Sequence, residues 1–490
     1  MLKTAGWLLP AILALAGCSS SGQRHEQTLS QALTALGQDK ALIGASSGVM
    51  VRDAESGTVL YQAQAEQRLA PASNMKMFTS LAAFGVLGAD YRFETRLLTT
   101  GEQRGDTLRG DLYLQGSGDP TLHPDDLDTF AATLAQRGIR HIHGRLILDA
   151  SAFDQTPFGA GWSWDDEPFA FAAPISALNY AFTPGGDINV VRVDVQPGAR
   201  AGAPGRVSFY PANDAVTLVN RTTTTTGGDT ALTFDRQPGS NRIVVSGTVA
   251  AQAEASSRLI TVDQPARVVG ALLQNALRAH GITLRGNAEE GVTPAGARLL
   301  AEKTSPPLSR LAVTFLKVSN NGYGEVLTKA MGRKTQGKGD WAAGLQAIGR
   351  FVQSQGIEAG AYRQVDGSGL SRMNQITPQQ LTTLLLAARK QPWFADWYNA
   401  LPIAGQPGLL VGGTLRSRMV KSAAAGRAHA KSGSMTGVSS LSGYVDSATG
   451  RPLAFAIISN NYLVPGAEVK ALEDRLVETL AACDATVVCR

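Results

Sequence analysis

Ser73 and Lys76 stand three positions apart where an apolar segment with helical spacing begins, at residues 69–87. Residues i and i+3 of a helix share one face, so the serine hydroxyl and the lysine amine would lie side by side. A serine is a weak nucleophile until a neighbouring base accepts its proton, and an amine whose pKa is lowered by burial or by another cation can be that base. Pro71 suits the first turn of such a helix. The pair therefore predicts nucleophilic catalysis by Ser73.

Two further motifs follow the serine. Ser319-Asn320-Asn321 fits S-x-N, and Lys431-Ser432-Gly433 fits K-[ST]-G. A single S-x-x-K is a weak motif; alone, Ser319 would more simply be a helix cap and Lys431 a solvated strand lysine. The three motifs occur in the order in which penicillin-recognising serine enzymes carry them, and neither S-x-x-K nor K-[ST]-G occurs elsewhere in the chain. Their ordered combination favours one shared catalytic site.

These motifs and their surroundings resemble the class C low-molecular-mass penicillin-binding proteins, the type-4 D-alanyl-D-alanine carboxypeptidase/endopeptidases of bacterial cell-wall metabolism. The likeness covers nearly the whole chain after its leader. It is carried by KVSNNGYGEVL at 317–327, VDGSGLSR at 365–372, AKSGSMTGV at 430–438, GWSWDD at 161–166 and APISALN at 173–179. The resemblance implies a periplasmic enzyme that cleaves peptidoglycan stem peptides and cross-links, is inhibited by β-lactam antibiotics and uses no cofactor or metal.

The expected mechanism gives each motif residue a role. Ser73 attacks the peptide carbonyl while neutral Lys76 accepts its proton, and Lys431 helps to keep Lys76 deprotonated and attracts the carboxylate of the substrate. Ser319 relays a proton to the leaving amine, and Asn321 orients Lys76 and the substrate. In the family that the chain resembles, the oxyanion is bound by two backbone N–H groups, which here belong to Ser73 and Ser434.

The resemblance also implies substrate-binding residues outside the catalytic motifs. Asp166 and Phe171 match positions that contact the amine and stem of diaminopimelic acid, and Arg372 matches another substrate-binding position. The alternatives are a helix cap, a core residue and a surface ion pair, respectively. Ser432 and Gly433 belong to the strand motif, where Ser432 replaces a commoner threonine. Thr436 stands where better-known relatives have glutamine, so its part in side-chain recognition is open.

The N-terminus has the pattern of an export signal. Lys3 precedes a short apolar run, and Leu15-Ala16-Gly17-Cys18 resembles a bacterial lipoprotein signal. We expect residues 1–17 to be removed and Cys18 to be lipidated, with an outer-membrane anchor as the only membrane contact; cleavage near Ala16 by ordinary signal peptidase is the alternative. Cys483 and Cys489 would suit a short disulfide loop in an oxidising compartment, and neither has metal-ligand partners nearby.

Length and motif spacing predict the domain organisation. Ser73 and Ser319 are 319 − 73 = 246 residues apart, which is too long for a connection within one domain. We expect a penicillin-binding peptidase domain at 24–88 and 301–490, and a strand-rich insertion at 89–300 that forms a mixed α/β domain and a mostly β domain. The fold class would be mixed α/β, a penicillin-binding/serine β-lactamase-like transpeptidase fold with an antiparallel sheet flanked by helices.

Helices and strands are expected on both sides of the insertion boundary. The predicted helices are 25–36, 125–136, 268–280, 341–355, 378–389 and 468–480. The predicted strands are 48–52, 57–62, 93–99, 108–115, 144–148, 190–195, 215–219, 231–234, 242–249, 429–432, 441–445 and 453–459. Thr222–Thr226 would be an exposed loop or an edge strand.

Composition excludes some functional classes and leaves others open. The net charge of +5 is small for 490 residues and the basic residues are scattered, so we expect no nucleic-acid partner. A serine β-lactamase is the nearest enzymatic alternative, although no omega-loop glutamate pattern is evident. A non-catalytic peptidoglycan-binding lipoprotein is the alternative from another class, and the intact motifs argue against it. The resemblance is compatible with a homodimer.

Overall fold

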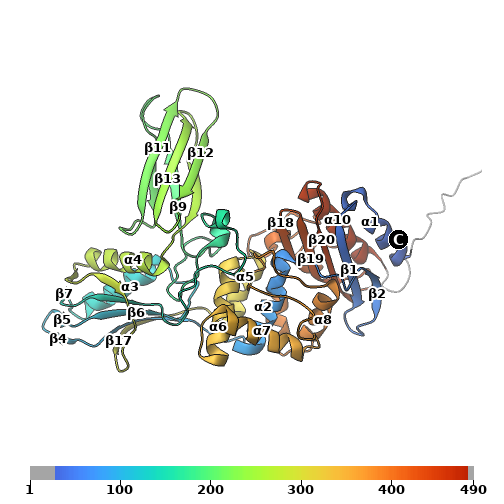
Figure 1. Ribbon diagram of the computed structural model, residues 1–490, viewed down its shortest axis with the longest axis horizontal. Helices are drawn as coiled ribbons and strands as arrows, with labels where there is room; N and C mark the ends of the chain where they lie inside the picture. The colour runs from blue at the N-terminus through green and yellow to red at the C-terminus, as the bar shows by residue number, and fades with distance from the viewer. Residues whose placement is uncertain (1–27, 484–490) are drawn as a thin grey trace, which may run out of the picture.

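The computed structural model describes residues 28–483, which form helices and five β-sheets (Figure 1). The predicted signal peptide, Cys18 and Cys489 lie outside the described residues. Cys483 is disulfide-bonded. No helix within residues 28–483 combines the length and the apolar character needed to cross a membrane.

An antiparallel five-stranded sheet joins the two ends of the chain. Its strand order is β18-β19-β20-β1-β2, so the last three strands of the chain are hydrogen-bonded to the first two through the β20–β1 pair. The strands are β1 (Ser46–Asp53), β2 (Val59–Ala63), β18 (Ala428–Met435), β19 (Val438–Asp446) and β20 (Pro452–Asn460). β18, which carries the K-S-G motif, lies at the edge of the sheet.

Each face of this sheet is covered by helices, because its strands are apolar on both sides. Leu453, Phe455 and Ile457 of β20 pack in the core under α1 (Leu29–Gly37) and α10 (Gly466–Ala482). The alternating residues Ala454, Ala456 and Ile458 pack in the other core, beside α2 (Met75–Leu87) and α8 (Pro378–Ala388). Successive strand residues point to opposite faces, so this alternation builds the two cores.

A helical layer extends from α2 towards the middle of the molecule (Figure 1). Its helices are α5 (Leu308–Lys317), α6 (Asn321–Gln336), α7 (Trp341–Ser354) and α9 (Phe394–Asn399). The Asn320 side chain caps α6 by accepting a hydrogen bond from the Tyr323 N–H, and Gly337 ends the helix in the left-handed conformation at φ 72°. The start of α6 is thereby fixed at the S-x-N motif.

Two sheets with two helices form the mixed part of the insertion. A five-stranded sheet has the order β16-β8-β6-β3-β17, and a four-stranded sheet has the order β15-β7-β5-β4. The strands are β3 (Glu94–Thr99), β4 (Glu102–Arg104), β5 (Thr107–Arg109), β6 (Leu112–Gly116), β7 (His141–Ile142), β8 (Leu146–Asp149), β15 (Thr283–Leu284), β16 (Ala288–Glu290) and β17 (Arg298–Thr304). Helices α3 (Pro124–Gln136) and α4 (Pro265–Ala279) pack against each other and share an apolar core with these strands.

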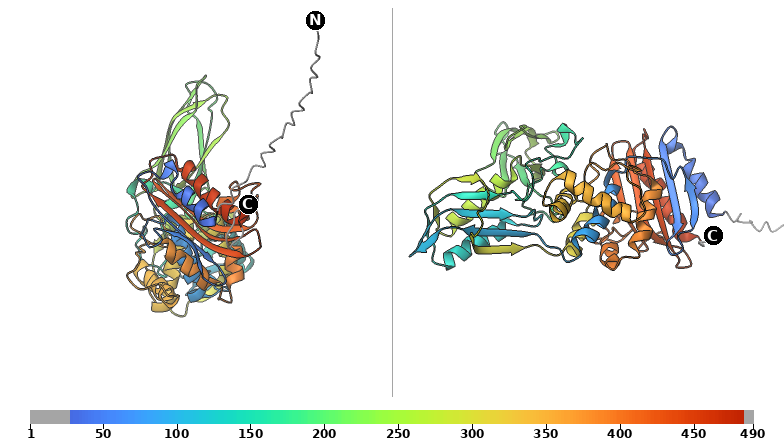
Figure 2. Two further views of the ribbon diagram at one scale, coloured as in Figure 1. Left: turned by 90° about the vertical axis from the view of Figure 1, so that its right-hand side faces the viewer. Right: turned by 60° about the horizontal axis from the view of Figure 1, so that its bottom comes forward.

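Two three-stranded sheets form a β arm that rises from the rest of the molecule (Figures 1 and 2). One has the order β10-β9-β14 and the other β11-β13-β12. The strands are β9 (Val190–Gln196), β10 (Arg206–Tyr210), β11 (Thr217–Thr225), β12 (Ala231–Arg236), β13 (Arg242–Ala250) and β14 (Ser256–Thr261). Four of the five threonines, 222–225, lie in β11, at an edge of its sheet. Thr222 and Thr224 are buried, and their hydroxyls accept hydrogen bonds from backbone N–H groups.

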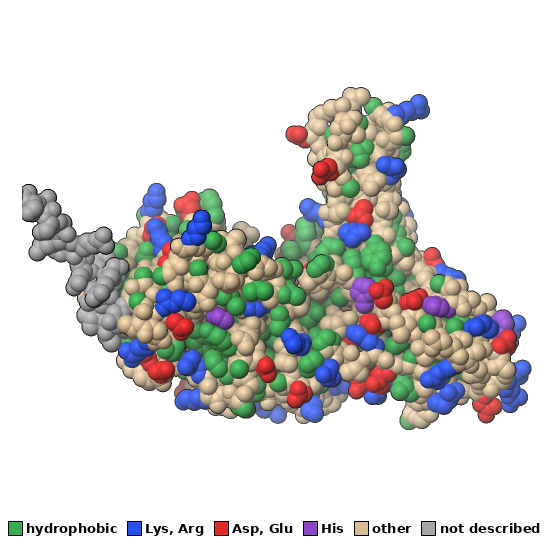
Figure 3. Space-filling view, turned by 180° about the vertical axis from the view of Figure 1, so that it is seen from behind, with side chains coloured by type: hydrophobic (Ala, Val, Ile, Leu, Met, Phe, Trp, Pro, Cys, Tyr) green, Lys and Arg blue, Asp and Glu red, His purple; other side chains and the backbone are tan. Residues whose placement is uncertain are grey.

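The mixed α/β class and the antiparallel sheet flanked by helices agree with the prediction. Several bounds differ. The predicted strand at 108–115 is two strands, because Gly110, at φ 146°, interrupts it in close contact with Gly101. The predicted insertion boundary at residue 300 falls inside β17, which continues to Thr304 beside β3. Side chains of both charges are interspersed over the face shown in Figure 3.

Candidate active site

Ser73 lies in a short 3-10 turn, Ala72–Asn74, that leads directly into α2. This differs from the prediction that Ser73 would be within the α-helix itself. Ala72 has φ +48°, a conformation that non-glycine residues rarely adopt, so surrounding contacts must hold the turn. The Ser440 hydroxyl of β19 donates to the Pro71 carbonyl at 2.7 Å, and the Asn460 side chain of β20 bonds both backbone groups of Ala70.

The Lys76 amine is at hydrogen-bond distance from three oxygens. Its Nζ lies 3.0 Å from Ser73 Oγ, 2.6 Å from Asn321 Oδ1 and 2.7 Å from the carbonyl oxygen of Ser368. The S-x-x-K and S-x-N motifs therefore meet at one amine, although 245 residues separate Lys76 from Asn321. Asn321 is held from its other side, because its Nδ2 donates to the Phe171 carbonyl at 2.8 Å.

The environment of Lys76 favours the neutral amine. Lys76 is fully buried, and burial lowers its pKa from 10.5 to about 7, while the nearby carboxylates of Glu325 and Asp366 oppose the shift. A lysine with a pKa near neutrality can accept a proton from the serine 3.0 Å away.

Lys431 meets Ser319 on the opposite side of the site. Its Nζ donates to Ser319 Oγ at 2.8 Å and to the Ser432 carbonyl at 2.6 Å. Burial, and then the charge of Lys76, hold the pKa of Lys431 well below its ordinary value. Ser319 has φ +63°, and Asn320 fixes this turn by donating to the carbonyls of Gly185 and Gly186 in the insertion.

Above these groups lies a cavity of about 520 Å³. Ser73, Ser319 and Asn321 line it on one side; the rest of its wall is Gly161, Ser163, Asp165, Asp166, Phe171, Gly369, Leu370, Arg372, Ser434, Met435 and Thr436. The cavity thus combines the nucleophile with residues from the insertion and from β18. Burial and Asp165 raise the pKa of Asp166, and Arg372 lowers it. Arg372 also donates to the Thr436 carbonyl at 3.1 Å.

The predicted residues Ser432 and Gly433 do not line this cavity. The Ser432 hydroxyl bonds to Thr414 Oγ1 at 2.8 Å. Gly433 instead permits close packing of β18 on the nucleophile turn, because a Cβ there would lie 2.6 Å from the Pro71 carbonyl oxygen and 2.9 Å from the Ser73 nitrogen. Both residues therefore position the strand rather than form the cavity wall.

Two buried carboxylates beneath the site were not predicted from the sequence. Glu325 accepts from the N–H groups of Gly367 and Ser368 at 2.8 and 2.7 Å, and from the Trp341 indole at 2.7 Å. Asp366 accepts from the N–H of Gly369 at 2.8 Å and from three further donors. They fix the 366–369 turn whose Ser368 carbonyl bonds Lys76. Glu325 lies in the GEVL segment and Asp366 in the VDGSG segment, and no spacing pattern in the sequence indicates that these two segments meet.

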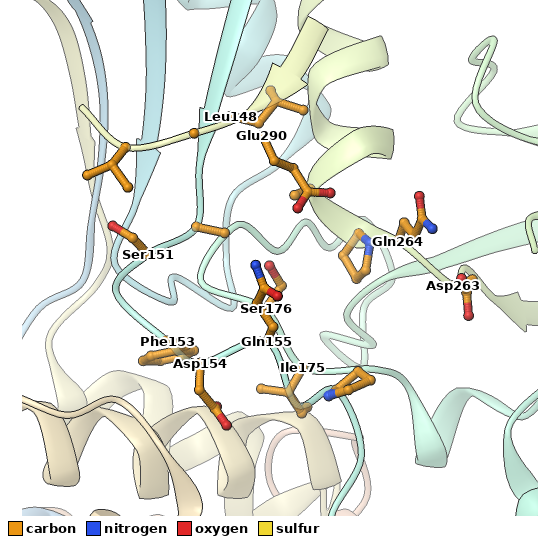
Figure 4. A pocket seen from close by; sticks show the side chains of 16 residues that line it. Leu148, Ser151, Phe153, Asp154, Gln155, Ile175, Ser176, Asp263, Gln264 and Glu290 are labelled. Carbon is orange, nitrogen blue, oxygen red and sulfur yellow. The ribbon is translucent and has the colours of Figure 1, made fainter. Parts of the chain in front are cut away.

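Another cavity, of about 640 Å³, lies away from these motifs and is lined only by residues of the insertion (Figure 4). Asp154, Asp263 and Glu290 are among its lining residues, but each is paired with a basic side chain. None of the residues predicted to bind substrate lines it. Among residues 28–483, no group of three or more His, Cys, Asp or Glu side chains is placed to hold a metal ion.

The sequence profile of the D-Ala-D-Ala carboxypeptidase 3 (S13) family matches residues 29–483. A D-alanyl-D-alanine carboxypeptidase of Actinomadura sp. (strain R39) is 41% identical over 480 residues, which are 97% of this chain and 88% of that protein. The crystal structure of penicillin binding protein 4 (dacB) from Haemophilus influenzae superposes with a TM-score of 0.80 at 26% identity, over 91% of this chain and 98% of that chain. The same protein has been solved in complex with a β-lactam.

Proposed function

This chain belongs to the D-Ala-D-Ala carboxypeptidase 3 (S13) family, and on that premise we propose that it is a periplasmic serine D-alanyl-D-alanine carboxypeptidase and endopeptidase. Its substrates are peptidoglycan stem peptides and cross-links, and β-lactams acylate it. The observation that carries the proposal is the Lys76 amine, 3.0 Å from Ser73 Oγ, with a pKa lowered to about 7 by burial.

Acylation begins at Ser73. Lys76 accepts the hydroxyl proton while Ser73 Oγ attacks the carbonyl of the penultimate D-alanine, which forms a C–O bond and a tetrahedral oxyanion. The backbone N–H groups of Ser73 and Ser434, both of which line the cavity, donate to that oxyanion. Asn321 holds the Lys76 amine in place through its 2.6 Å contact.

Collapse of the tetrahedral intermediate breaks the peptide C–N bond. The leaving amine needs a proton, and Ser319 supplies it from its hydroxyl while Lys431, 2.8 Å away, replenishes that hydroxyl. Lys431 also attracts the carboxylate at the end of the substrate. Lys76 then loses to solvent the proton that it took from Ser73, and Lys431 regains one from solvent. Neutral Lys76 accepts a proton from the water that attacks the acyl-enzyme, and it returns this proton to Ser73 Oγ when the C–O bond breaks and the shortened stem peptide leaves.

The resemblance implies a preference for diaminopimelate stems, and the residues of the cavity wall support it. Asp166 attracts the side-chain amine, Phe171 contacts the hydrocarbon stem and Arg372 attracts a carboxylate. Thr436 contributes its backbone carbonyl, which already holds Arg372. In this proposal the chain is exported by its leader and anchored through lipidated Cys18, and Cys483 pairs with Cys489; a homodimer is compatible with it.

The experiment is intact-protein mass spectrometry after incubation with benzylpenicillin, followed by peptide mapping. We expect one stable adduct on Ser73, which the Ser73→Ala variant lacks and the exposed-serine control Ser354→Ala retains. An unmodified protein with intact drug would refute the proposed nucleophile. An unmodified protein with rapid hydrolysis of the drug would instead indicate a β-lactamase.

A further inference from the structure

Three arginines surround a second cavity beside the active site. This cavity has a volume of about 660 Å³, and its wall includes Arg68, Arg363 and Arg372, with Tyr362, Met373 and Gln375 between them. No acidic residue lines it. Within residues 28–483, no carboxylate oxygen lies within 4 Å of any of the three guanidinium groups, and all three arginine side chains are exposed. Arg68 and Arg363 are therefore available to an anion, whereas Arg372 already bonds the Thr436 carbonyl and is close enough to Asp166 to lower the pKa of that carboxyl.

The second cavity continues the catalytic one. Arg372 lines both cavities, so the two adjoin at its side chain. Arg372 itself is oriented by its bond to the Thr436 carbonyl at the rim of the first cavity. The two cavities thus lie next to each other, with Ser73 on the wall of the first and Arg68 and Arg363 on the wall of the second.

The backbone that carries these arginines is ordered by short hydrogen-bonded pairs. Arg363 and Gln375 exchange both backbone hydrogen bonds, each at 2.8 Å. Leu69 and Ile376 do the same at 2.8 and 3.0 Å, so Arg68 is attached to the same ladder. Because Arg68 and Leu69 lead into the Ser73 turn, these pairs hold the backbone of Arg68 and Arg363 close in space to the backbone that carries the nucleophile.

Guanidinium groups suit carboxylates, because their planar N–H donors match the two carboxylate oxygens. Their cavity is within the size range of ligand sites and can enclose a few residues of peptide. We propose that Arg68, Arg363 and Arg372, which we name the arginine groove, form a subsite for a carboxylate-bearing arm of a branched peptidoglycan peptide whose scissile bond lies at Ser73. This inference rests on the proposed function and assigns recognition of the acidic arm of a cross-linked peptide to Arg68 and Arg363, beside the Arg372 position.

The test compares two substrates that differ only in charge. One is a purified cross-linked muropeptide, and the other is the same muropeptide with the carboxylates of its donor arm amidated. We expect wild-type protein to cleave the acidic form with a kcat/KM about tenfold higher, because charge-assisted hydrogen bonds at exposed sites contribute modestly. The preference should shrink between low and high salt, since the arginines are exposed.

The Arg68→Gln/Arg363→Gln double variant should cleave both forms with similar kcat/KM, through a raised KM for the acidic form. Its melting temperature checks that it is folded, and Arg285→Gln, an exposed arginine of the insertion, is the matched control that should keep the preference. A double variant that still prefers the acidic substrate would overturn the groove. If wild-type protein cleaves both forms equally, the proposal of the arginine groove is refuted and the proposed peptidase function is not. If it cleaves neither form, the proposed function is refuted as well.

Discussion

The rate of Ser73 acylation should depend on pH through the Lys76 amine. With a pKa of about 7, about 1% of Lys76 is neutral at pH 5 and about 90% at pH 8. An ordinary lysine, with a pKa of 10.5, would be neutral in only about one molecule in 3,000 at pH 7. We therefore expect the rate constant for penicillin acylation to rise about tenfold per pH unit below pH 6 and to level off above pH 8.

Replacement of Glu325 by glutamine should move this profile. Lys76 Nζ donates to the Ser368 carbonyl, and Glu325 Oε1 accepts from the Ser368 N–H. The Lys76 ammonium and the Glu325 carboxylate therefore contact the same residue from two sides and lie roughly 7 Å apart. At an effective dielectric constant of about 20, that separation gives about 2.4 kcal/mol, or about 1.7 pH units. Burial raises the pKa of Glu325 to about 7, so it is only partly charged there and the shift should be about one unit.

The pH profile of acylation should shift to lower pH in Glu325→Gln. A carboxylate stabilises the lysine ammonium, so Glu325→Gln lowers the pKa of Lys76 and the acid limb moves to lower pH. Stopped-flow measurement of the acylation rate constant with a fluorescent penicillin, at about ten pH values across pH 4.5–9, determines this shift. Glu358→Gln, at an exposed residue on the chain between α7 and α8, is the control and should not move the profile. A profile that is flat between pH 5 and 8, or a shift to higher pH, would refute the role of Lys76 as the base.

Three further predictions concern packing, charge and recognition. Gly433→Ala should slow acylation by about 100-fold, because its Cβ would lie 2.6 Å from the Pro71 carbonyl and displace β18 from the nucleophile turn; acylation kinetics measure this. Arg418→Leu should lower the free energy of unfolding by about 3 kcal/mol, because it leaves buried Glu473 without its 2.9 Å partner; thermal melting measures this. Asp166→Asn should lower kcat/KM about tenfold for stems with a free side-chain amine and leave the N-acetylated stem unaffected; peptide hydrolysis measures this.

Each of these variants has an internal check. Gly227→Ala adds a Cβ with nothing within 4 Å and should acylate at the wild-type rate. Arg418→Leu combined with Glu473→Leu removes both charges and should recover much of the lost stability. An equal loss on free and acetylated stems in Asp166→Asn would contradict recognition of the amine.

The motifs predicted which groups meet but not what holds them. Ser73, Lys76, Asn321 and Lys431 could be identified because each lies in a short pattern whose order is specific. Glu325 could not, because its partners, at residues 341, 367 and 368, are brought to it by the packing of α6 on α7 and on the 366–369 turn, and no local spacing records such a contact. Buried polar groups are satisfied by tertiary neighbours, so they become visible only in the folded chain.

Local conformation was predicted where propensity and packing agree. Thr377, Pro378 and Gln380 form a capping box with proline at the first turn, and the predicted start of that helix at 378 is confirmed. The prediction that Ser73 would lie within the α-helix was wrong, because Ala72 has no local preference for its φ of +48°. Contacts of Pro71 and Ala70 with β19 and β20 impose that conformation, and they come from residues nearly 400 positions later.

The strand order β18-β19-β20-β1-β2 has a consequence for biosynthesis. The ribosome delivers Ser73 and Lys76 early, but the strands that brace the Ser73 turn and carry Lys431 are among the last to be made. Until residue 428 has emerged, the growing chain has a serine without its supporting strands and only two of the five strands of this sheet. A chain truncated before β18 would therefore be inert towards β-lactams, and reactivity with the drug marks a chain that has been synthesised as far as the strands that support Ser73.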